Sequence, residues 1–300
     1  MTAPLPPLPA TLPVRRLGPA DLAACSELAV SRGGGAEEHK WHFLLTHGTG
    51  WGIDAPDGRG LAATTVLTRY AGGLAAVSMV LVAARHEGRG LGRRIMTHVL
   101  GEAGDDTVTL HATDRGRPLY EKLGFRAVGT VVTHRGTFRP PAAAAPHHPD
   151  HPDHPARPRP VTEADLPALL ALDAEVFGAD RSPLLRDLPR FAERTLVTEE
   201  DGRLTGWASA WRNDGTLVVG PVVADTTAGA RRLVTAIARD GGGPVRLDLR
   251  TEDPLRHTLP AWAAEHGVLP VFPNTLMVLG DRALPGDDTR RHTPLMVALG

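Results

Sequence analysis

The 300-residue chain is long enough for two domains, each of which could bury its own hydrophobic core. It carries 33 Lys and Arg against 34 Asp and Glu, which gives a formal net charge of -1. This balance excludes a general attraction to nucleic acid or to an anionic membrane, so we expect neither as a partner, and recognition of any charged ligand must be local.

The N-terminal residues and the single cysteine indicate a cellular compartment. The stretch MTAPLPPLPATLP has neither a basic n-region nor a continuous apolar h-region, and no apolar run in the chain approaches the roughly 20 residues that a bilayer requires. Cys25 lies in DLAACSELAV, near the apolar stripe of a predicted helix, where a small buried filler is a better interpretation than a nucleophile. We therefore expect a reducing compartment, most simply the cytoplasm.

The chain repeats one pattern of strands and helices. Apolar runs and periodicity in the first half predict, in chain order, a short strand from residue 14, a helix at 20–31, strands at 61–69 and 75–83, a helix at 91–103, a strand at 107–113 and a helix at 116–123. Later, RPVTEADL echoes VRRLGPADL, and PVRLDLR echoes TVTLHAT. Two copies of one α+β unit are therefore expected.

The segment between the copies reads RPPAAAAPHHPDHPDHPARPRP, residues 139–160. Its prolines remove hydrogen-bond donors and fix φ so often that neither a helix nor a central strand can persist, so we expect a linker. Its four histidines (His147, His148, His151 and His154) do not have the spacing of a rigid ligand set, and no metal is expected. The predicted domains are 1–138 and 161–300, joined by this linker.

The stretch EGRGLGRR, which follows the strand predicted at 75–83, is a candidate anion site. Glycines at 88, 90 and 92 would let the backbone approach a ligand, and the N–H groups of the helix that follows would point at it. Arg89, Arg93 and Arg94 could add charge-assisted bonds to phosphate oxygens. The spacing fits neither the Walker A motif nor the dinucleotide fingerprint, and a plain tight turn is the alternative interpretation.

Two blocks, VSMVLVAARHEGRGLGRRIM and LHATDRGRPLYEKLGFRAVG, resemble the GNAT superfamily of acyl-CoA-dependent N-acyltransferases. The resemblance covers about residues 14–138 and implies a twisted mixed β-sheet flanked by helices, with acetyl-CoA as co-substrate and no metal. It departs at Glu87, where the family carries Arg or Gln. On this resemblance the glycine turn binds the pyrophosphate of coenzyme A, through Glu87, Gly88, Arg89, Gly90, Leu91, Gly92 and Arg93.

The resemblance also implies where the rest of the substrate lies. The pantetheine arm would pair with the backbone of the strand as a surrogate strand. The strand residues concerned are Met79, Val80, Leu81 and Val82. Tyr120, in RPLYEKLGF, matches the family's usual proton donor to the departing sulfur, and packing of its ring is the structural alternative.

The general base and the acceptor site are less constrained by these motifs. His111 ends a predicted strand and has a pKa range suited to a base, although a purely structural histidine is the alternative. Glu37 and Glu38 could bind a cationic amine, and Trp41 could stack on it; an ordinary amphipathic helix start is equally consistent. These side chains favour a primary amine of a small molecule or peptide as the acceptor.

The second copy, residues 161–300, contains blocks such as VFGADRS, VGPVVADTTAGARRLV and VRLDLRTEDP, and through them it resembles the second domain of tandem GNAT proteins. It lacks the glycine turn and the tyrosine of the first copy. The turn reads ADTTAGARRL without alternating glycines, Trp262 or Ala263 stands where the first copy has Tyr120, and Pro221 interrupts the strand at a position that a bulge could accommodate. The second copy is expected to cover a sheet edge of the first, to wall the acceptor pocket or to form a homodimer. A different function, an acyl-CoA-binding sensor or scaffold without catalysis, stays open.

Overall fold

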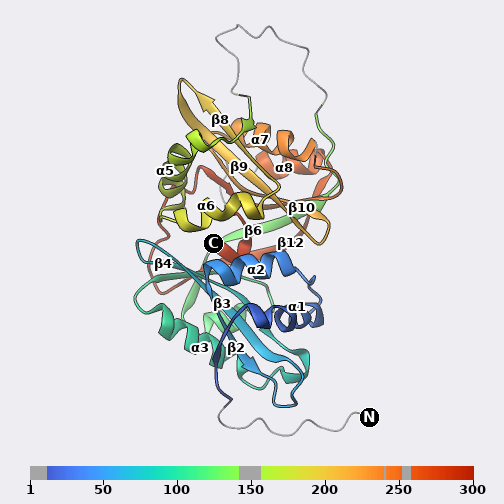
Figure 1. Ribbon diagram of the computed structural model, residues 1–300, viewed down its shortest axis with the longest axis vertical. Helices are drawn as coiled ribbons and strands as arrows, with labels where there is room; N and C mark the ends of the chain where they lie inside the picture. Colours follow the sequence, from blue (N-terminus) through green and yellow to red (C-terminus); the bar gives the residue numbers. More distant parts are fainter. Residues whose placement is uncertain (1–11, 142–156, 240, 252–257) are drawn as a thin grey trace. The chain divides into compact units, whose positions relative to one another are not determined.

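The computed structural model describes residues 12–141, 157–239, 241–251 and 258–300. The four histidines of the predicted linker lie outside the described residues. Contacts divide the chain into two compact units, which are described separately (Figure 1). Unit 1 contains residues 1–69 and 75–108, and unit 2 contains 70–74 and 109–300. The predicted boundaries at 138 and 161 stay predictions, because unit 2 includes chain segments from both sequence halves.

Unit 1 is built on an antiparallel sheet whose order is β1-β2-β3-β4. Its elements are β1 (Arg15–Leu17), α1 (Leu22–Ser31), α2 (Glu38–His47), β2 (Thr49–Asp54), β3 (Leu61–Tyr70), β4 (Leu74–Val82) and α3 (Leu91–Ala103). The strands and helices predicted for this part of the chain are confirmed. Cys25 is a buried free thiol whose pKa burial raises to about 12, which confirms the structural interpretation.

Alternation along β2 explains how helices cover both faces of this sheet. A side chain at Gly50 would meet Leu45 of α2, whereas Trp51 makes an edge contact with His98 of α3. Because successive residues of a strand point to opposite faces, α2 and α3 lie on opposite sides of the sheet. Ile53 and Ile95 share one buried cluster, which fixes α3 and therefore the turn that precedes it.

Unit 2 is a mixed sheet with the order β5-β12-β6-β11-β10-β9-β8-β7, and β13 lies beside β10. The strands are β5 (Thr107–Ala112), β6 (Phe125–Gly136), β7 (Arg159–Pro160), β8 (Arg194–Glu200), β9 (Arg203–Asn213), β10 (Thr216–Ala224), β11 (Val245–Arg250), β12 (Val268–Leu279) and β13 (Arg291–Thr293). The helices are α4 (Arg117–Glu121), α5 (Leu166–Phe177), α6 (Ser182–Phe191), α7 (Thr227–Arg239) and α8 (Thr258–Glu265). The mixed sheet flanked by helices confirms the predicted α+β class.

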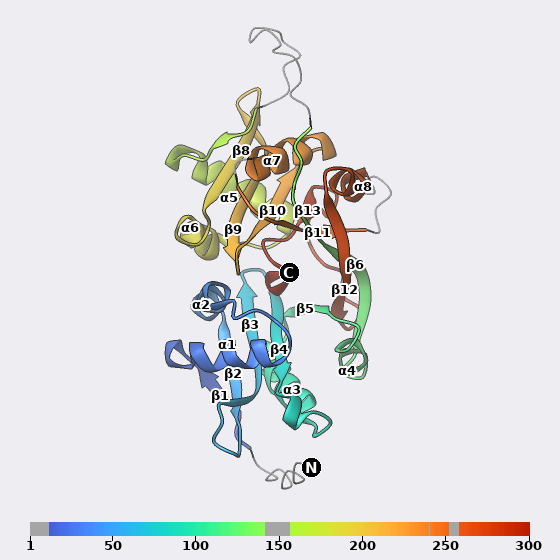
Figure 2. The ribbon, with the colours of Figure 1, turned by 90° about the vertical axis from the view of Figure 1, so that its right-hand side faces the viewer.

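Strands from the two sequence halves alternate in the middle of this sheet. The late strand β12 pairs with both β5 and β6, and the early strand β6 pairs with both β12 and β11 (Figure 2). In Figure 2, β6 in green runs beside β12 in red. Neither half therefore completes its own sheet, and β12 covers the edge of β5, which is one of the roles expected for the second half.

The repeat predicted from the sequence is visible in matching ion pairs. Arg15 donates two hydrogen bonds to Asp21, and Arg159 donates two to Asp165 in the same position of the second half. In each half the aspartate is the N-cap residue of the first long helix. Each arginine also pairs with an acidic residue of the neighbouring strand region, Asp54 or Glu199.

In the part of the chain that the structure describes, no helix is long and apolar enough to cross a membrane. Nor do these residues include a group of three or more His, Cys, Asp or Glu side chains placed to hold a metal ion.

Candidate functional site

The glycine turn of unit 1 has an open surface next to the first turn of α3. Gly88 and Gly90 have φ values of +69° and +79°, in the left-handed region that side chains rarely adopt. Nothing lies within 4 Å of a Cβ built on either glycine, so a ligand can reach the backbone there. Gly90 caps α3, and the next residues, Leu91, Gly92 and Arg93, form its first turn, where N–H groups are not used within the helix.

One ion pair at this turn was not anticipated from the sequence. Glu87, the residue that departs from the family pattern, forms an ion pair of 2.5 Å with Arg32 at the C-terminus of α1. The pair offsets a negative charge that would otherwise repel a phosphate group. Arg32 lies 55 positions from Glu87 in the chain, so no local motif could have revealed it.

Beneath the turn, His86 is buried and its Nδ1 lies 3.3 Å from Nη1 of Arg89. Burial, with Arg85 and Arg89 nearby, lowers the pKa of His86. The ring is therefore neutral near pH 7, and its unprotonated nitrogen can accept a hydrogen bond from the Arg89 guanidinium. This contact orients Arg89, which the sequence analysis predicts to bind phosphate oxygens.

The strand that leads into the turn is irregular and partly open. Met79 has a φ of +49°, and the hydroxyl of Thr64 donates to its carbonyl at 2.9 Å. From Met79 to Val82 the residues are only half-buried, whereas the preceding residues of β4 are buried. The residues of the glycine turn and those of β4 that are expected to bind coenzyme A thus lie together in unit 1.

The equivalent strand of the second half is closed. Every residue of β10 is buried, and its edge is occupied by β13, which pairs antiparallel at Val222 and Val223. The main chain also covers Gly220, where an added Cβ would lie 2.2 Å from the carbonyl oxygen of Pro294. The bulge expected at Pro221 is present as a register shift between Val219 and Val222.

Tyr120 lies on α4 in unit 2 and is largely buried, with its ring edge-on to Phe125 at a centroid distance of 6.0 Å. Burial raises the pKa of its phenol to about 12, so the hydroxyl stays protonated and can donate a hydrogen bond at neutral pH. In the second half, Trp262 packs against Phe138 and offers no hydroxyl.

His111, on β5 in unit 2, is half-buried, and its Nδ1 lies 2.9 Å from the carbonyl oxygen of Val297. Burial lowers its pKa to about 4, against the raising effects of that carbonyl and of Asp248. The imidazole is therefore neutral at physiological pH, as a base must be before it accepts a proton.

The three residues expected to bind the acceptor amine lie at the start of α2, but they do not share one environment. Glu37 caps the helix in a left-handed conformation and pairs with Lys40, and Glu38 begins the helix. Trp41 is fully buried, so its indole packs in the interior and has no exposed face on which an amine could stack. The prediction that Trp41 stacks on the amine is therefore wrong. Binding of an amine by the carboxylates of Glu37 and Glu38 stays a prediction.

Comparison with known proteins identifies the family. A model of the acetyltransferase (GNAT) domain matches residues 62–138, and a second model of the same description matches 169–292. The uncharacterized N-acetyltransferase YitH of Bacillus subtilis strain 168 is 30% identical over 189 residues, which span 62% of this chain and 64% of that relative. The match thus covers less than two thirds of the relative's length.

Solved structures support the same fold. A putative acetyltransferase from Pyrococcus horikoshii aligns with a TM-score of 0.73 at 18% identity, over 96% of this chain and 95% of its own. A tandem GNAT protein from the clavulanic acid biosynthesis pathway aligns with a TM-score of 0.62 at 15% identity, over 91% and 100% of the two chains. With two matched domains that together span more than half of its length, the chain belongs to the GNAT acetyltransferases and carries two domains of that family in tandem.

Proposed function

We propose that the protein is an acetyl-CoA-dependent N-acetyltransferase that transfers the acetyl group to a primary amine of a small molecule or peptide. The observation that carries the proposal is the open left-handed turn at Gly88 and Gly90, placed between a half-exposed strand and the N-terminus of α3. A pyrophosphate needs this combination of reachable N–H groups, a favourable helix dipole and nearby arginines. The buried, unreactive Cys25 suits a reducing compartment, and we propose the cytoplasm.

The proposed reaction is a direct transfer. The neutral amine nitrogen attacks the thioester carbonyl carbon, the C–S bond breaks, and the products are an amide and the free thiol. Backbone N–H groups near Leu81 and Val82 would polarise the carbonyl, and Tyr120 would donate a hydrogen bond to the departing thiolate, which takes its proton from solvent to become the free thiol. His111 would accept the proton that the attacking nitrogen loses.

A direct assay distinguishes this function from acyl-CoA sensing. Release of free thiol from acetyl-CoA, measured over a panel of amines, should depend on the amine and should generate the acetylated product. Saturable acetyl-CoA binding without amine-dependent thiol release across the panel would instead identify a binding protein.

Replacing Gly90 by valine should weaken acetyl-CoA binding at least tenfold, or about 1.4 kcal/mol. Valine would fill the space through which a ligand reaches the turn, and it strains a backbone with a φ of +79°. Gly104→Val is a matched control, because Gly104 ends the same helix with a φ of +61° and is equally open. Calorimetry measures the affinity of the two folded variants for acetyl-CoA. If Gly90→Val and Gly104→Val bind it equally well, the turn does not bind the phosphate groups.

We also expect each chain to bind one acetyl-CoA, in the first half only. The edge of β10 already pairs with β13, and the turn after it lacks the paired glycines. In hydrogen exchange, acetyl-CoA should protect the amides of residues 79–82 and leave those of 222–224 unchanged. A stoichiometry of two per chain, or a second saturable site whose affinity Gly90→Val leaves unchanged, would show that the second half is a working site.

A further inference from the structure

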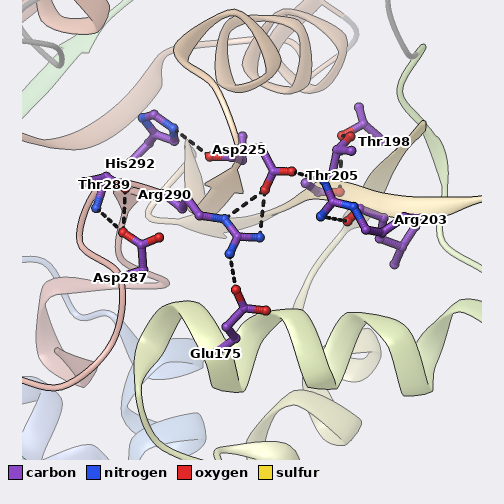
Figure 3. Close-up of polar contacts among 12 residues, drawn as sticks. Glu175, Thr198, Arg203, Thr205, Asp225, Asp287, Thr289, Arg290 and His292 are labelled. Atoms are coloured by element: carbon purple, nitrogen blue, oxygen red, sulfur yellow. Dashed lines mark hydrogen bonds and ion pairs between the residues drawn. The ribbon is translucent and has the colours of Figure 1, made fainter. Parts of the chain in front are cut away.

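The segment 287–299, here called the C-terminal strap, is held at its start by ion pairs in unit 2. Arg290 inserts its guanidinium between Asp225, at 2.7 Å, and the carboxylate of Glu175 on α5 (Figure 3). Asp225 also accepts a hydrogen bond of 2.6 Å from Arg203. The amide of Asp287 donates to Val176 at 2.9 Å. The amide of Ala224, the last residue of β10, donates to the carbonyl of Arg290 at 3.0 Å, so the start of the strap is fixed to both β10 and α5.

The middle of the strap cannot slide along β10. The hydroxyl of Thr293 donates to the carbonyl of Val219 at 3.3 Å, and the indole of Trp211 donates to the carbonyl of Leu295 at 3.1 Å. The backbone at Pro294 passes so close to Gly220 that no side chain would fit between them. These contacts and the ion pairs of Arg290 together hold the strap in one register along β10, and loss of any of them should loosen that register.

The far end of the strap contacts the candidate base. The carbonyl of Val297 faces Nδ1 of His111 at 2.9 Å, and the carbonyl of Leu299 accepts a hydrogen bond from Tyr70 at 2.7 Å. A carbonyl oxygen can only accept, so Nδ1 must carry the hydrogen. In a neutral imidazole this leaves the lone pair on Nε2, and the ring orientation is set by the strap.

We propose that the C-terminal strap positions His111 for proton abstraction, with Arg290 as the positioning residue and the Val297 carbonyl as the contact that selects the tautomer. The inference rests on the proposed function, in which His111 is the base. Charged groups that act on His111 from neighbouring elements are Asp248 and Arg250 of β11 and Arg291 of β13. The second half thus contributes to catalysis through the placement of one side chain, without a cofactor site of its own.

The test measures the tautomer of His111 directly. Long-range proton–nitrogen NMR spectra of histidine-labelled protein report which ring nitrogen carries hydrogen, and His111→Gln assigns the signal among the 14 histidines. The wild type should show hydrogen on Nδ1. In Arg290→Met the signal should become a mixture of tautomers, kcat should fall about tenfold, and the KM for acetyl-CoA should stay within about twofold.

Two further variants keep the test decisive. Arg203→Met is the matched control, because it removes an exposed partner of the same Asp225 and leaves the strap's own ion pair in place, so tautomer and kcat should be unchanged. If Arg290→Met does not fold, Thr293→Val takes its place. This variant removes the hydrogen bond from Thr293 to the carbonyl of Val219 and should also give a mixture of tautomers.

Hydrogen on Nε2 in the wild type, or an unchanged tautomer in folded Arg290→Met and Thr293→Val, would overturn the positioning role. A mixed tautomer with an unchanged kcat would overturn it too, because the placement of His111 would then have no catalytic effect. If no amine supports thiol release in the wild type, the proposed function fails, and the proposal with it, whereas the spectra still report separately whether the strap selects the tautomer.

Discussion

Tyr120→Phe should lower kcat roughly 100-fold, the lower end of the range for a general acid, while the affinity for acetyl-CoA stays nearly level. The substitution deletes one oxygen and keeps the ring that packs against Phe125. The loss therefore falls on stabilisation of the departing thiolate and not on the fold.

The pKa of Tyr120 refines its role. At about 12 it lies above the usual value near 8.5 for a thiol, so complete transfer of the phenolic proton to sulfur is uphill. The hydrogen bond that the phenol donates to the growing negative charge is what lowers the barrier. The same high pKa keeps the donor protonated through pH 10, so its loss should not limit the rate on the alkaline side of neutrality.

Steady-state kinetics and calorimetry together measure this prediction. Phe125→Leu serves as the control, since it removes the edge contact but keeps the phenol, and its kcat should stay within about threefold. If Tyr120→Phe retains the wild-type kcat, then water or another group stabilises the departing thiolate and the assignment of Tyr120 is wrong.

Asp173→Ala should reduce the free energy of unfolding by about 3–5 kcal/mol. Asp173 and Arg181 form a bidentate pair at 2.7 and 2.8 Å, and each side chain is only 1% exposed. Burial disfavours the charged guanidinium, but the Asp173 carboxylate more than offsets this and raises the pKa of Arg181. Without the carboxylate, an arginine that cannot lose its proton would be left buried over the ring of Phe177.

Urea denaturation followed by tryptophan fluorescence checks this value against a surface pair. Asp187 pairs with Arg190 on α6, where the arginine is 89% exposed, so Asp187→Ala should cost at most about 1 kcal/mol. Replacing both buried partners, with Asp173→Leu and Arg181→Met together, should recover much of the loss. A cost below about 1 kcal/mol for Asp173→Ala alone would mean that water reaches Arg181.

Local pattern was sufficient for the parts of the site that are contiguous in the chain. The apolar run ending near Val82, the glycines at 88 and 90 and the periodicity after Leu91 predict a strand, a turn and a helix, and the structure has all three. The duplicated Arg and Asp before the first long helices likewise predicted the repeat. These features depend on glycine positions and on the spacing of apolar residues, both of which can be read from neighbouring residues in the sequence.

Contacts between residues far apart in the chain could not be predicted from local sequence patterns. Nothing local distinguishes β6 paired within its own half from β6 placed between β12 and β11, because the two halves carry similar strands and the hydrogen bonds are equivalent. The same holds for Arg32 beside Glu87, and for β13, a strand of three residues. Trp41 was misplaced because the amphipathic start of α2 does not reveal which side is covered.

The interleaved strands have a consequence for biosynthesis. Thr109 of β5 bonds to Met277 of β12 across 168 positions, so β5 and β6 leave the ribosome long before β12 exists. At about 5–20 residues per second, the wait is on the order of ten seconds, during which those strand edges have no native partner. Folding of this part must therefore be largely post-translational and slow, since closure of such distant pairs is entropically costly. A nascent chain stalled near the linker would be a substrate for chaperones rather than a free-standing first domain.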